Sequence, residues 1–146
     1  MYLRPLARQL YKKGTMRIAI PVHMGRVSPL LDVAERILLF EVQAGRELWR
    51  QEVFVQEGGL GPRARALVAL QAPVIICGGI SRQLEQMLTS SGVRLVAQTC
   101  GPVQEVMDAY LRDGLTGNAF SMPGRARRRR RHRGGRLRRP VPAAGK

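Results

Sequence analysis

The stretch "VIICGGISRQLEQMLTSSGVRLV", residues 74–96, decides the fold class of this chain. Its first part, Val74–Cys77, has the length and the β-branched content of a buried strand. Residues Ser81–Gly92 follow with helical spacing of their apolar residues, a serine suited to the N-cap and a glycine suited to the stop. A second strand-like run covers Val93–Gln98. Strand, helix and strand with short connections predict a right-handed crossover between two parallel strands.

The segments on either side of this unit extend the same pattern. Further strands are expected at Arg17–Val22, which should stop at Pro21, and at Arg36–Val42 and Glu47–Val55, which flank the hairpin-like connection "QAGR". The second hairpin strand alternates imperfectly and is expected to be an edge strand with one wet side. Helices are expected at Gly61–Gln71 and Gly101–Gly114. The sequence therefore predicts a three-layer α/β domain with an approximately five-stranded mixed sheet, one antiparallel strand and about three flanking helices.

The positive charge of the chain is concentrated at its two ends. The net charge is +15, yet residues 17–117 hold ten arginines and ten acidic residues. Residues 1–16 carry four basic groups and no acid, and residues 124–146 carry ten arginines and a lysine, again with no acid. We therefore expect an N-terminal extension at 1–15, a neutral domain at 16–117 and an Arg-rich disordered tail at 118–146, with Met16 rather than Met1 as the natural start.

Composition and motifs exclude several classes of protein. No apolar run approaches the roughly 20 residues that span a bilayer, and no secretory signal is visible. The two cysteines of the chain are too few for a disulfide scaffold, so a reducing cytoplasm is the expected compartment. The sequence has no Walker loop, dinucleotide fingerprint or paired-carboxylate set. We expect a cytoplasmic protein that does not span the membrane and is not an enzyme.

Candidate binding residues follow the strands that are expected to run parallel. The carboxyl ends of such strands share one sheet edge, where open α/β sheets bind ligands. Three loops reach that edge. They carry His23 and Met24 after the first strand, Cys77, Gly78 and Gly79 after the central strand, and Cys100 and Gly101 after the last. Two thiols and an imidazole form a soft-ligand set suited to iron–sulfur species, zinc or copper, so Cys77, Cys100 and His23 are the candidate metal ligands. The helix N-termini at Ser81 and Pro102 would attract anions.

Cys77 admits three interpretations at this point. It can be a metal ligand, a nucleophile, or a small hydrophobe that closes a buried strand. The nucleophile is the least favoured, because His23 is the only histidine of the expected domain that could serve as its base. The choice between ligand and core residue stays open and depends on whether Cys100 lies within reach.

Two kinds of macromolecular partner are suggested by the sequence. The basic residues 124–146 could contact nucleic acid or another anion through charge alone, without sequence specificity, or could be only a solvated tail. The expected edge strand Glu47–Val55 could pair with a second copy of the chain to give a homodimer.

Four stretches carry a family resemblance. They are "MRIAIPV" (16–22), "GRVSPLLDVAERILLFEV" (25–42), the stretch quoted at the outset (74–96) and "GPVQEVMDAYLRDGL" (101–115). In order and spacing they resemble the dinitrogenase iron-molybdenum cofactor biosynthesis family, which includes NifX-type carriers and the C-terminal domain of NifB-type proteins. The resemblance implies a ribonuclease H-like fold and the transient, non-catalytic binding of an iron–sulfur or iron–molybdenum-type cofactor or precursor. The implied partners are cofactor-assembly or client metalloproteins.

Overall fold

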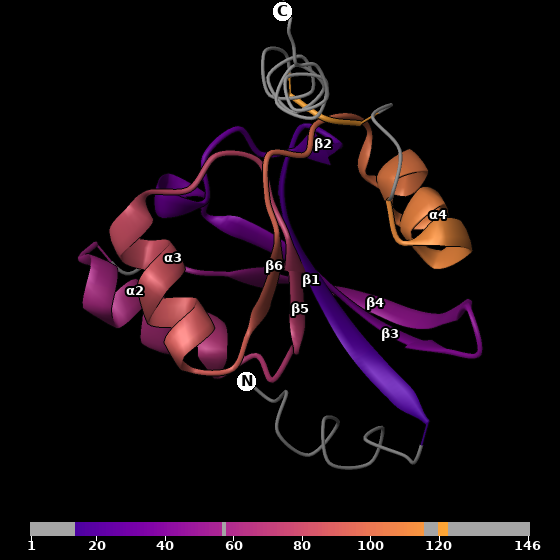
Figure 1. Ribbon diagram of the computed structural model, residues 1–146, viewed down its shortest axis with the longest axis horizontal. Coiled ribbons are helices and arrows are strands. Elements are labelled where there is room, and N and C mark those ends of the chain that lie inside the picture. Colours follow the sequence, from indigo (N-terminus) through magenta and orange to yellow (C-terminus); the bar gives the residue numbers. More distant parts are fainter. Residues whose placement is uncertain (1–13, 57, 116–119, 123–146) are drawn as a thin grey trace, which may run out of the picture.

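A computed structural model describes residues 14–56, 58–115 and 120–122 of the chain (Figure 1). The expected extension at 1–15 and the tail at 118–146 therefore lie largely outside the described residues. The elements in chain order are β1 (Thr15–His23), β2 (Arg26–Val27), the 3-10 helix η1 (Leu31–Val33), β3 (Arg36–Gln43), β4 (Arg46–Phe54), α2 (Leu60–Val68), β5 (Val74–Ile76), α3 (Arg82–Ser90), β6 (Arg94–Val96) and α4 (Val103–Asp113). None of the helices within these ranges has the length and apolar character needed to cross a membrane.

The strands form one mixed sheet in the order β4-β3-β1-β5-β6, and the short β2 pairs with β1 beside this path. β1, β5 and β6 are parallel to one another, whereas β3 is antiparallel to both of its neighbours, β1 and β4. The predicted mixed sheet with one antiparallel strand is therefore confirmed. The hairpin connection between β3 and β4 turns at Ala44 and Gly45, both with positive φ, which suits the twist of the flanking strands.

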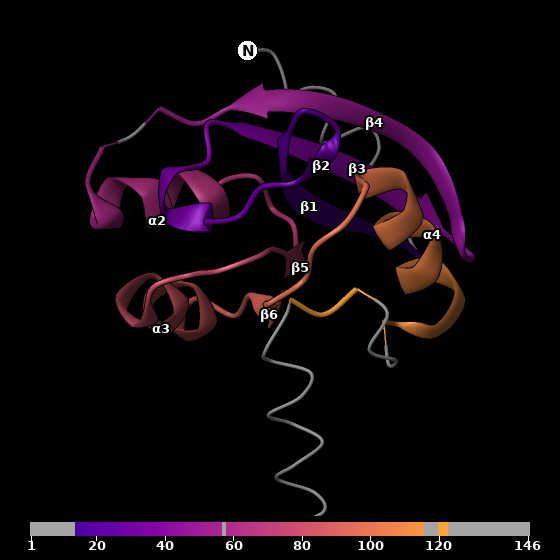
Figure 2. The same cartoon turned by 90° about the horizontal axis from the view of Figure 1, so that it is seen from above.

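Helices cover both faces of the sheet, α2 and α3 on one and α4 on the other (Figure 2). Because successive strand residues point to opposite faces, neighbours on β1 belong to different cores. Ala19 packs in the cluster that contains Leu67 of α2 and Leu84 of α3. Ile18 packs in the second cluster with Val106 of α4. The central parallel strand β5 is fully buried and forms a continuous apolar run, which is why its position could be predicted from the sequence.

The first strand is longer than predicted, because it continues through Pro21 to His23. Pro21 stays in register with Ile37 of β3, and its carbonyl accepts a hydrogen bond from the N–H of Ser28 (N–O distance 2.8 Å). The expected stop at Pro21 was wrong because the fixed φ of proline is compatible with an extended strand. The chain then reverses at Met24 and Gly25, both with positive φ, to form β2 where only a loop was expected.

A buried arginine fixes the loop that precedes β3. Arg63 of α2 is 4% exposed, and its Nη1 donates to the carbonyl of Ala34 (2.6 Å) and more weakly to that of Leu31 (3.4 Å). These carbonyls belong to the first residue of η1 and to the residue that follows it, so the arginine holds a turn that has too few residues to be stable alone. η1 carries Asp32, whose position matters for the site described next.

Candidate functional site

The carboxyl ends of the parallel strands meet at one edge of the sheet, as the sequence predicted (Figure 1). The carbonyl of Cys77, just beyond β5, accepts a hydrogen bond from the N–H of Thr99 (3.0 Å). The carbonyl of Gly78 accepts one from the N–H of Gln98 (2.9 Å). The loops that carry the two cysteines therefore lie side by side, with Cys100 one residue beyond this contact.

Cys77 lies inside the molecule rather than on its surface. The residue is 0% exposed and belongs to the core cluster between the sheet and the helices α2 and α3. Burial raises the pKa of its thiol to about 12, and the negative charges of Glu85 and Asp32 act in the same direction. Because the thiolate is the form that binds metals, the native environment of Cys77 favours the core role over the ligand role. Its assignment as a ligand stays a prediction.

Gly78 and Gly79 allow a second loop to approach the backbone closely. A Cβ atom at Gly78 would lie 2.7 Å from the carbonyl oxygen of Ser28 and 2.9 Å from that of Pro29. The N–H of Gly79 donates to the carbonyl of Pro29 (2.7 Å), and the carbonyl of Gly79 accepts from the N–H of Leu31 (2.9 Å). In this conformation both glycines serve the packing of loop 28–31, and the backbone polar groups of Gly79 are engaged within the protein.

The N-terminus of α3 is capped by the protein itself. The Oδ1 atom of Asp32 accepts a hydrogen bond from the N–H of Ser81 (2.8 Å), and the hydroxyl of Ser81 accepts one from the N–H of Leu84 (3.2 Å). The predicted N-cap role of Ser81 is therefore confirmed. Asp32 was missed as a contributor, since a partner 49 residues distant leaves no local signal in the sequence. Its carboxylate already occupies the position where an anion was expected.

Cys100 is the more accessible of the two thiols, since it is half-buried. Its Sγ lies 3.7 Å from the carbonyl oxygen of Ser121, to which the thiol can donate. The N–H of Cys100 donates to the carbonyl of Phe120 (2.7 Å), and the N–H of Met122 donates to the carbonyl of Gln98 (2.9 Å). Residues 120–122 thus lie beside the segment that follows β6, where Ser121 forms an antiparallel bridge with Thr99. The arginine-rich residues begin three positions after Met122.

Gly101 follows Cys100 in a conformation that suits only glycine. Its φ is +129°, and a Cβ atom there would approach the ring of Phe120 to 3.0 Å. The carbonyl of Gly101 accepts a hydrogen bond from the N–H of Val27 in β2 (2.9 Å), and the carbonyl of Gly25 accepts one from the N–H of Val103 in α4 (2.9 Å). The hairpin of β1 and β2 therefore lies against the Cys100 loop and the start of α4.

His23 closes β1 at the mouth of that hairpin. Its side chain is exposed, and the adjacent Met24 is 87% exposed. Within residues 14–56, 58–115 and 120–122, no three or more His, Cys, Asp or Glu side chains are grouped so that they could hold a metal ion. The chain has two cysteines in all, so one copy cannot supply the four thiolates of a resident four-cysteine cluster.

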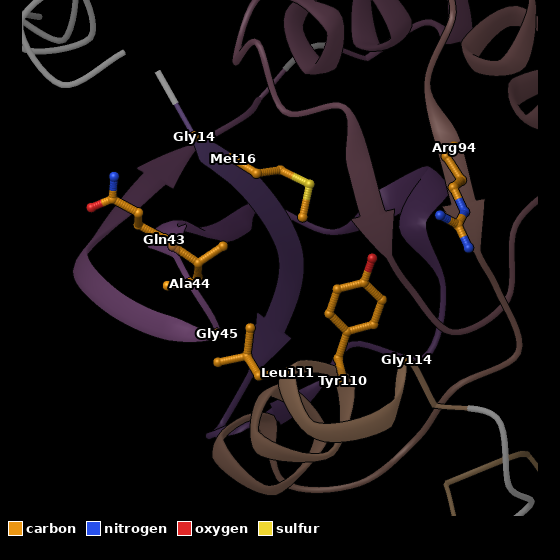
Figure 3. A pocket seen from close by; sticks show the side chains of 10 residues that line it. Gly14, Met16, Gln43, Ala44, Gly45, Arg94, Tyr110, Leu111 and Gly114 are labelled. Carbon is orange, nitrogen blue, oxygen red and sulfur yellow. The ribbon is translucent and has the colours of Figure 1, made fainter. Parts of the chain in front are cut away.

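One cavity lies at the site, and another lies far from it. A small one of about 60 Å³ lies at the Cys100 edge and is lined in part by Gln98, Thr99 and Ser121. A larger one of about 480 Å³ lies at the opposite end of the sheet, where β1 and β6 begin and α4 ends. Figure 3 shows the side chains of Met16, Arg94 and Tyr110 at this larger cavity. Sequence reasoning missed it, because it gathers residues from the amino ends of strands and from the last turn of a helix.

Comparison with known proteins places the chain in a family. The sequence model of the dinitrogenase iron-molybdenum cofactor family matches residues 14–113, which is more than half of the chain. The chain belongs to this family. The match begins one residue before β1 and ends with α4, so it covers every named helix and strand of the fold. A comparison with curated proteins gave no match.

Solved structures share the fold. The crystal structure of the protein PH0822 is 18% identical, with a TM-score of 0.65, and the alignment covers 77% of this chain and 98% of that one. A candidate dinitrogenase of Methanocaldococcus jannaschii is 14% identical, with a TM-score of 0.58 and coverage of 73% and 97%. A candidate NifB protein of Thermotoga is 23% identical, with a TM-score of 0.55 and coverage of 75% and 99%. At these identities the likeness shows the fold alone.

Proposed function

We propose that this member of the dinitrogenase iron-molybdenum cofactor family is a non-enzymatic carrier. Its cargo is an iron–sulfur or iron–molybdenum-type cofactor or a precursor, which it receives from or delivers to cofactor-assembly or client metalloproteins. The observation that carries the proposal is the family match over residues 14–113, which spans the sheet edge where both cysteine loops meet. The proposal requires a reducing compartment such as the cytoplasm, because the thiols must stay unpaired.

Cys100 is the residue that we propose to contact the cargo first. It is a soft ligand, half-buried, and set in a loop whose backbone is fixed by Phe120 and Val27. His23 is exposed at the end of β1, which is separated from β6 by β5, and is a second candidate ligand. A cargo bound through so few groups keeps open coordination positions that a partner protein can fill, which favours transfer over storage. A ligand role for Cys77 would require the edge of the sheet to open, because its thiol is buried.

Anaerobic reconstitution of the full chain with iron and sulfide tests the proposal. We expect a visible absorption band for the wild type, an unchanged band for Cys77→Ser and a lost band for Cys100→Ser. His23→Ala should weaken the band, whereas the exposed control Arg82→Ala should leave it unchanged. A colourless wild type contradicts cluster carriage. A band that survives in Cys100→Ser and disappears in Cys77→Ser moves the ligand role to the buried thiol.

A second function is proposed for the basic end of the chain, namely contact with nucleic acid or another polyanion. Met122 is hydrogen-bonded to Gln98 at the sheet edge, and ten arginines lie within residues 125–139. Residues 124–146 contain no Phe, Tyr or Trp, so binding would depend mainly on phosphate contacts and not on bases.

RNA-binding measurements at several salt concentrations test this second function. The full chain should bind with an affinity that falls steeply as salt rises, because counterions are released from the phosphates. Removal of residues 124–146 should abolish both the binding and its salt dependence. An affinity that truncation leaves unchanged contradicts the role of the tail and leaves the carrier proposal untouched.

A further inference from the structure

The strand β4 is the outermost strand on one side of the sheet. Within the described part of the chain, β3 is the only strand that pairs with β4, so the outer side of a nine-residue strand offers unpaired backbone groups. Exposed strand edges of this length are templates for pairing with another chain unless the protein protects them. Proline is absent from β4, and the irregularity in its pairing with β3 lies near the hairpin end, between Glu41 and Val42. The stretch Trp49–Phe54 is regularly paired and free to accept a further strand.

The side chains of β4 complement a second copy of the same strand. The exposed residues of the regularly paired stretch are two opposite charges, Arg50 and Glu52, and the apolar Phe54 (55% exposed). We propose that two copies of this chain pair antiparallel through β4, with Gln51 opposite its own symmetry mate. Each Arg50 then lies opposite the Glu52 of the other copy.

The opposite face of the strand fits the same register. With Gln51 on the two-fold axis, Trp49 of one copy faces Val53 of the other. Both side chains are half-buried and already pack against the core beneath α2 and α3. The apolar layer on that face would therefore continue across the two sheets, which together would form one sheet.

Neighbouring registers are disfavoured by charge and by the alternation of the strand. A pairing centred on Arg50 places two arginines opposite each other, and one centred on Glu52 places two carboxylates opposite each other, which is destabilising. A shift by a single residue brings the exposed face of one copy against the core face of the other. The register centred on Gln51 is the one that satisfies both charges within the regular stretch.

The charges within one copy do not oppose this pairing. Arg50 donates to both carboxylate oxygens of Glu47 (2.7 and 2.8 Å) and to Gln104 of α4 (2.6 Å), which holds its guanidinium on the exposed face. Glu52 accepts from Arg36 (3.0 Å) and is 41% exposed. In the dimer each Glu52 would lie between Arg36 of its own copy and Arg50 of the other. The result is a self-complementary charge network across the axis.

Charge reversal in the full chain tests the pairing through its dissociation constant, measured by analytical ultracentrifugation at near-physiological salt. Arg50→Glu and Glu52→Arg should each weaken the dimer by at least about tenfold, because each brings like charges together. The double variant Arg50→Glu/Glu52→Arg restores opposite charges across the axis and should associate more tightly than either single variant, although Glu47 and Arg36 of each copy then face like charges. Arg82→Glu on α3 is the matched control and should leave the dimer unchanged. A wild type that remains monomeric overturns the proposal, and so does a double variant as weak as the single ones.

A cysteine cross-link tests the register and depends less on the energetics of the charges. In a Cys100→Ser background, Gln51→Cys places two thiols beside the axis, so mild oxidation should give a disulfide-linked dimer. Glu47→Cys is the control, because its two copies would lie on opposite sides of the axis, more than about 20 Å apart. Equal cross-linking of both variants contradicts the register. Circular dichroism of each variant establishes that the fold is intact before association is measured.

Discussion

At the scale of single residues, environment separates the two thiols of the chain. Cys77 closes a central strand and is 0% exposed, whereas Cys100 is half-buried in a loop next to Ser121. The same residue type can therefore have two roles in one protein, one in the packing of the core and one near the surface. Because a buried thiol resists ionisation, the difference can be measured through pH as well as through chemical reactivity.

The stability of the protein should fall at alkaline pH because of Cys77. The pKa of its thiol is about 12 in the native state, compared with about 8.5 in an unfolded chain. Between these values the unfolded state releases the proton while the native state retains it, so the free energy of unfolding decreases by up to about 1.4 kcal/mol per pH unit. Below about pH 8 the thiol is protonated in both states, so its contribution to the free energy of unfolding does not change with pH. Denaturant titrations from neutral pH to about pH 10 should show this decline in the wild type.

The variant Cys77→Ala removes the titrating group and should show a smaller decline over the same range. Its stability at neutral pH will be lower because of the cavity, so the comparison concerns the slope and not the absolute value. Cys100→Ser retains Cys77 and is expected to retain the decline. Parallel slopes for the wild type and Cys77→Ala would rule out Cys77 as the source.

A single methyl group at Gly78 should destabilise the fold. In Gly78→Ala the new Cβ would lie 2.7 Å from the carbonyl oxygen of Ser28, so the backbone must shift, at a cost of about 1–3 kcal/mol. Gly58→Ala is the matched control, since nothing lies within 4 Å of a Cβ there. Urea unfolding of both variants measures the difference. Equal stability of the two would show that loop 28–31 does not pack against Gly78 in solution.

At the scale of elements, long-range contacts fix the start of α3. The helix has its own N-cap in Ser81, but the N–H of Ser81 depends on Asp32, which Arg63 positions through the backbone of η1. Three segments that are distant in the sequence therefore cooperate at one helix end. Such an arrangement ties α2, η1 and α3 into one unit on this side of the sheet.

Loss of the Asp32 carboxylate should weaken this unit. Asp32→Ala leaves the N–H of Ser81 without its acceptor and should lower the free energy of unfolding by about 1 kcal/mol, within the 0.5–2 kcal/mol found for helix caps. Asp32→Asn keeps an acceptor oxygen and should lose less. The exposed neighbour Glu35→Ala serves as the control for acidic residues in the same loop. If chemical denaturation gives Asp32→Ala the stability of Glu35→Ala, the cap contributes nothing.

At the scale of the whole molecule, a buried ion pair links the sheet to the helical layer. The Nε of Arg17 in β1 lies 3.1 Å from Oε1 of Glu41 in β3, and both side chains are at most 1% exposed. The Nη1 of Arg17 also donates to the carbonyl of Leu70, which follows α2 (3.1 Å). One arginine thus connects two central strands with the segment that leads into β5.

Breaking this pair should cost more than breaking a surface pair. Glu41→Leu leaves the Arg17 guanidinium buried without this carboxylate, and we expect a loss of about 3–5 kcal/mol. The double variant Arg17→Met/Glu41→Leu should lose less than the sum of the single variants, because the two charges are coupled. Arg36→Met, which breaks the exposed Arg36–Glu52 pair, is the control and should cost below about 1 kcal/mol. Thermal or urea unfolding provides all four values, and strict additivity would contradict the coupling.

Much of the fold could be predicted from the sequence, because its information was local. The run Val74–Cys77 is apolar where the sheet is covered on both faces, and Ser81 marks the start of the helix that follows it. The parallel direction of the strands around Ser81–Gly92 followed from the short crossover connection, and the antiparallel pair from the hairpin-like connection. Pro21 misled the prediction, since its ring was taken to end a strand that in fact continues to His23.

The sequence by itself determined the family, the mixed sheet and the edge at which the cysteine loops meet. Only the tertiary structure decided which thiol is the more accessible one, because accessibility depends on what packs around a residue and not on the residue itself. The tertiary structure also showed that the Ser28 carbonyl packs closely against Gly78 and that Asp32 caps α3. Both contacts join segments about 50 residues apart in the sequence. Periodicity carries no information about such contacts, because the free energy of packing between distant segments depends on their shape and distance in the folded chain.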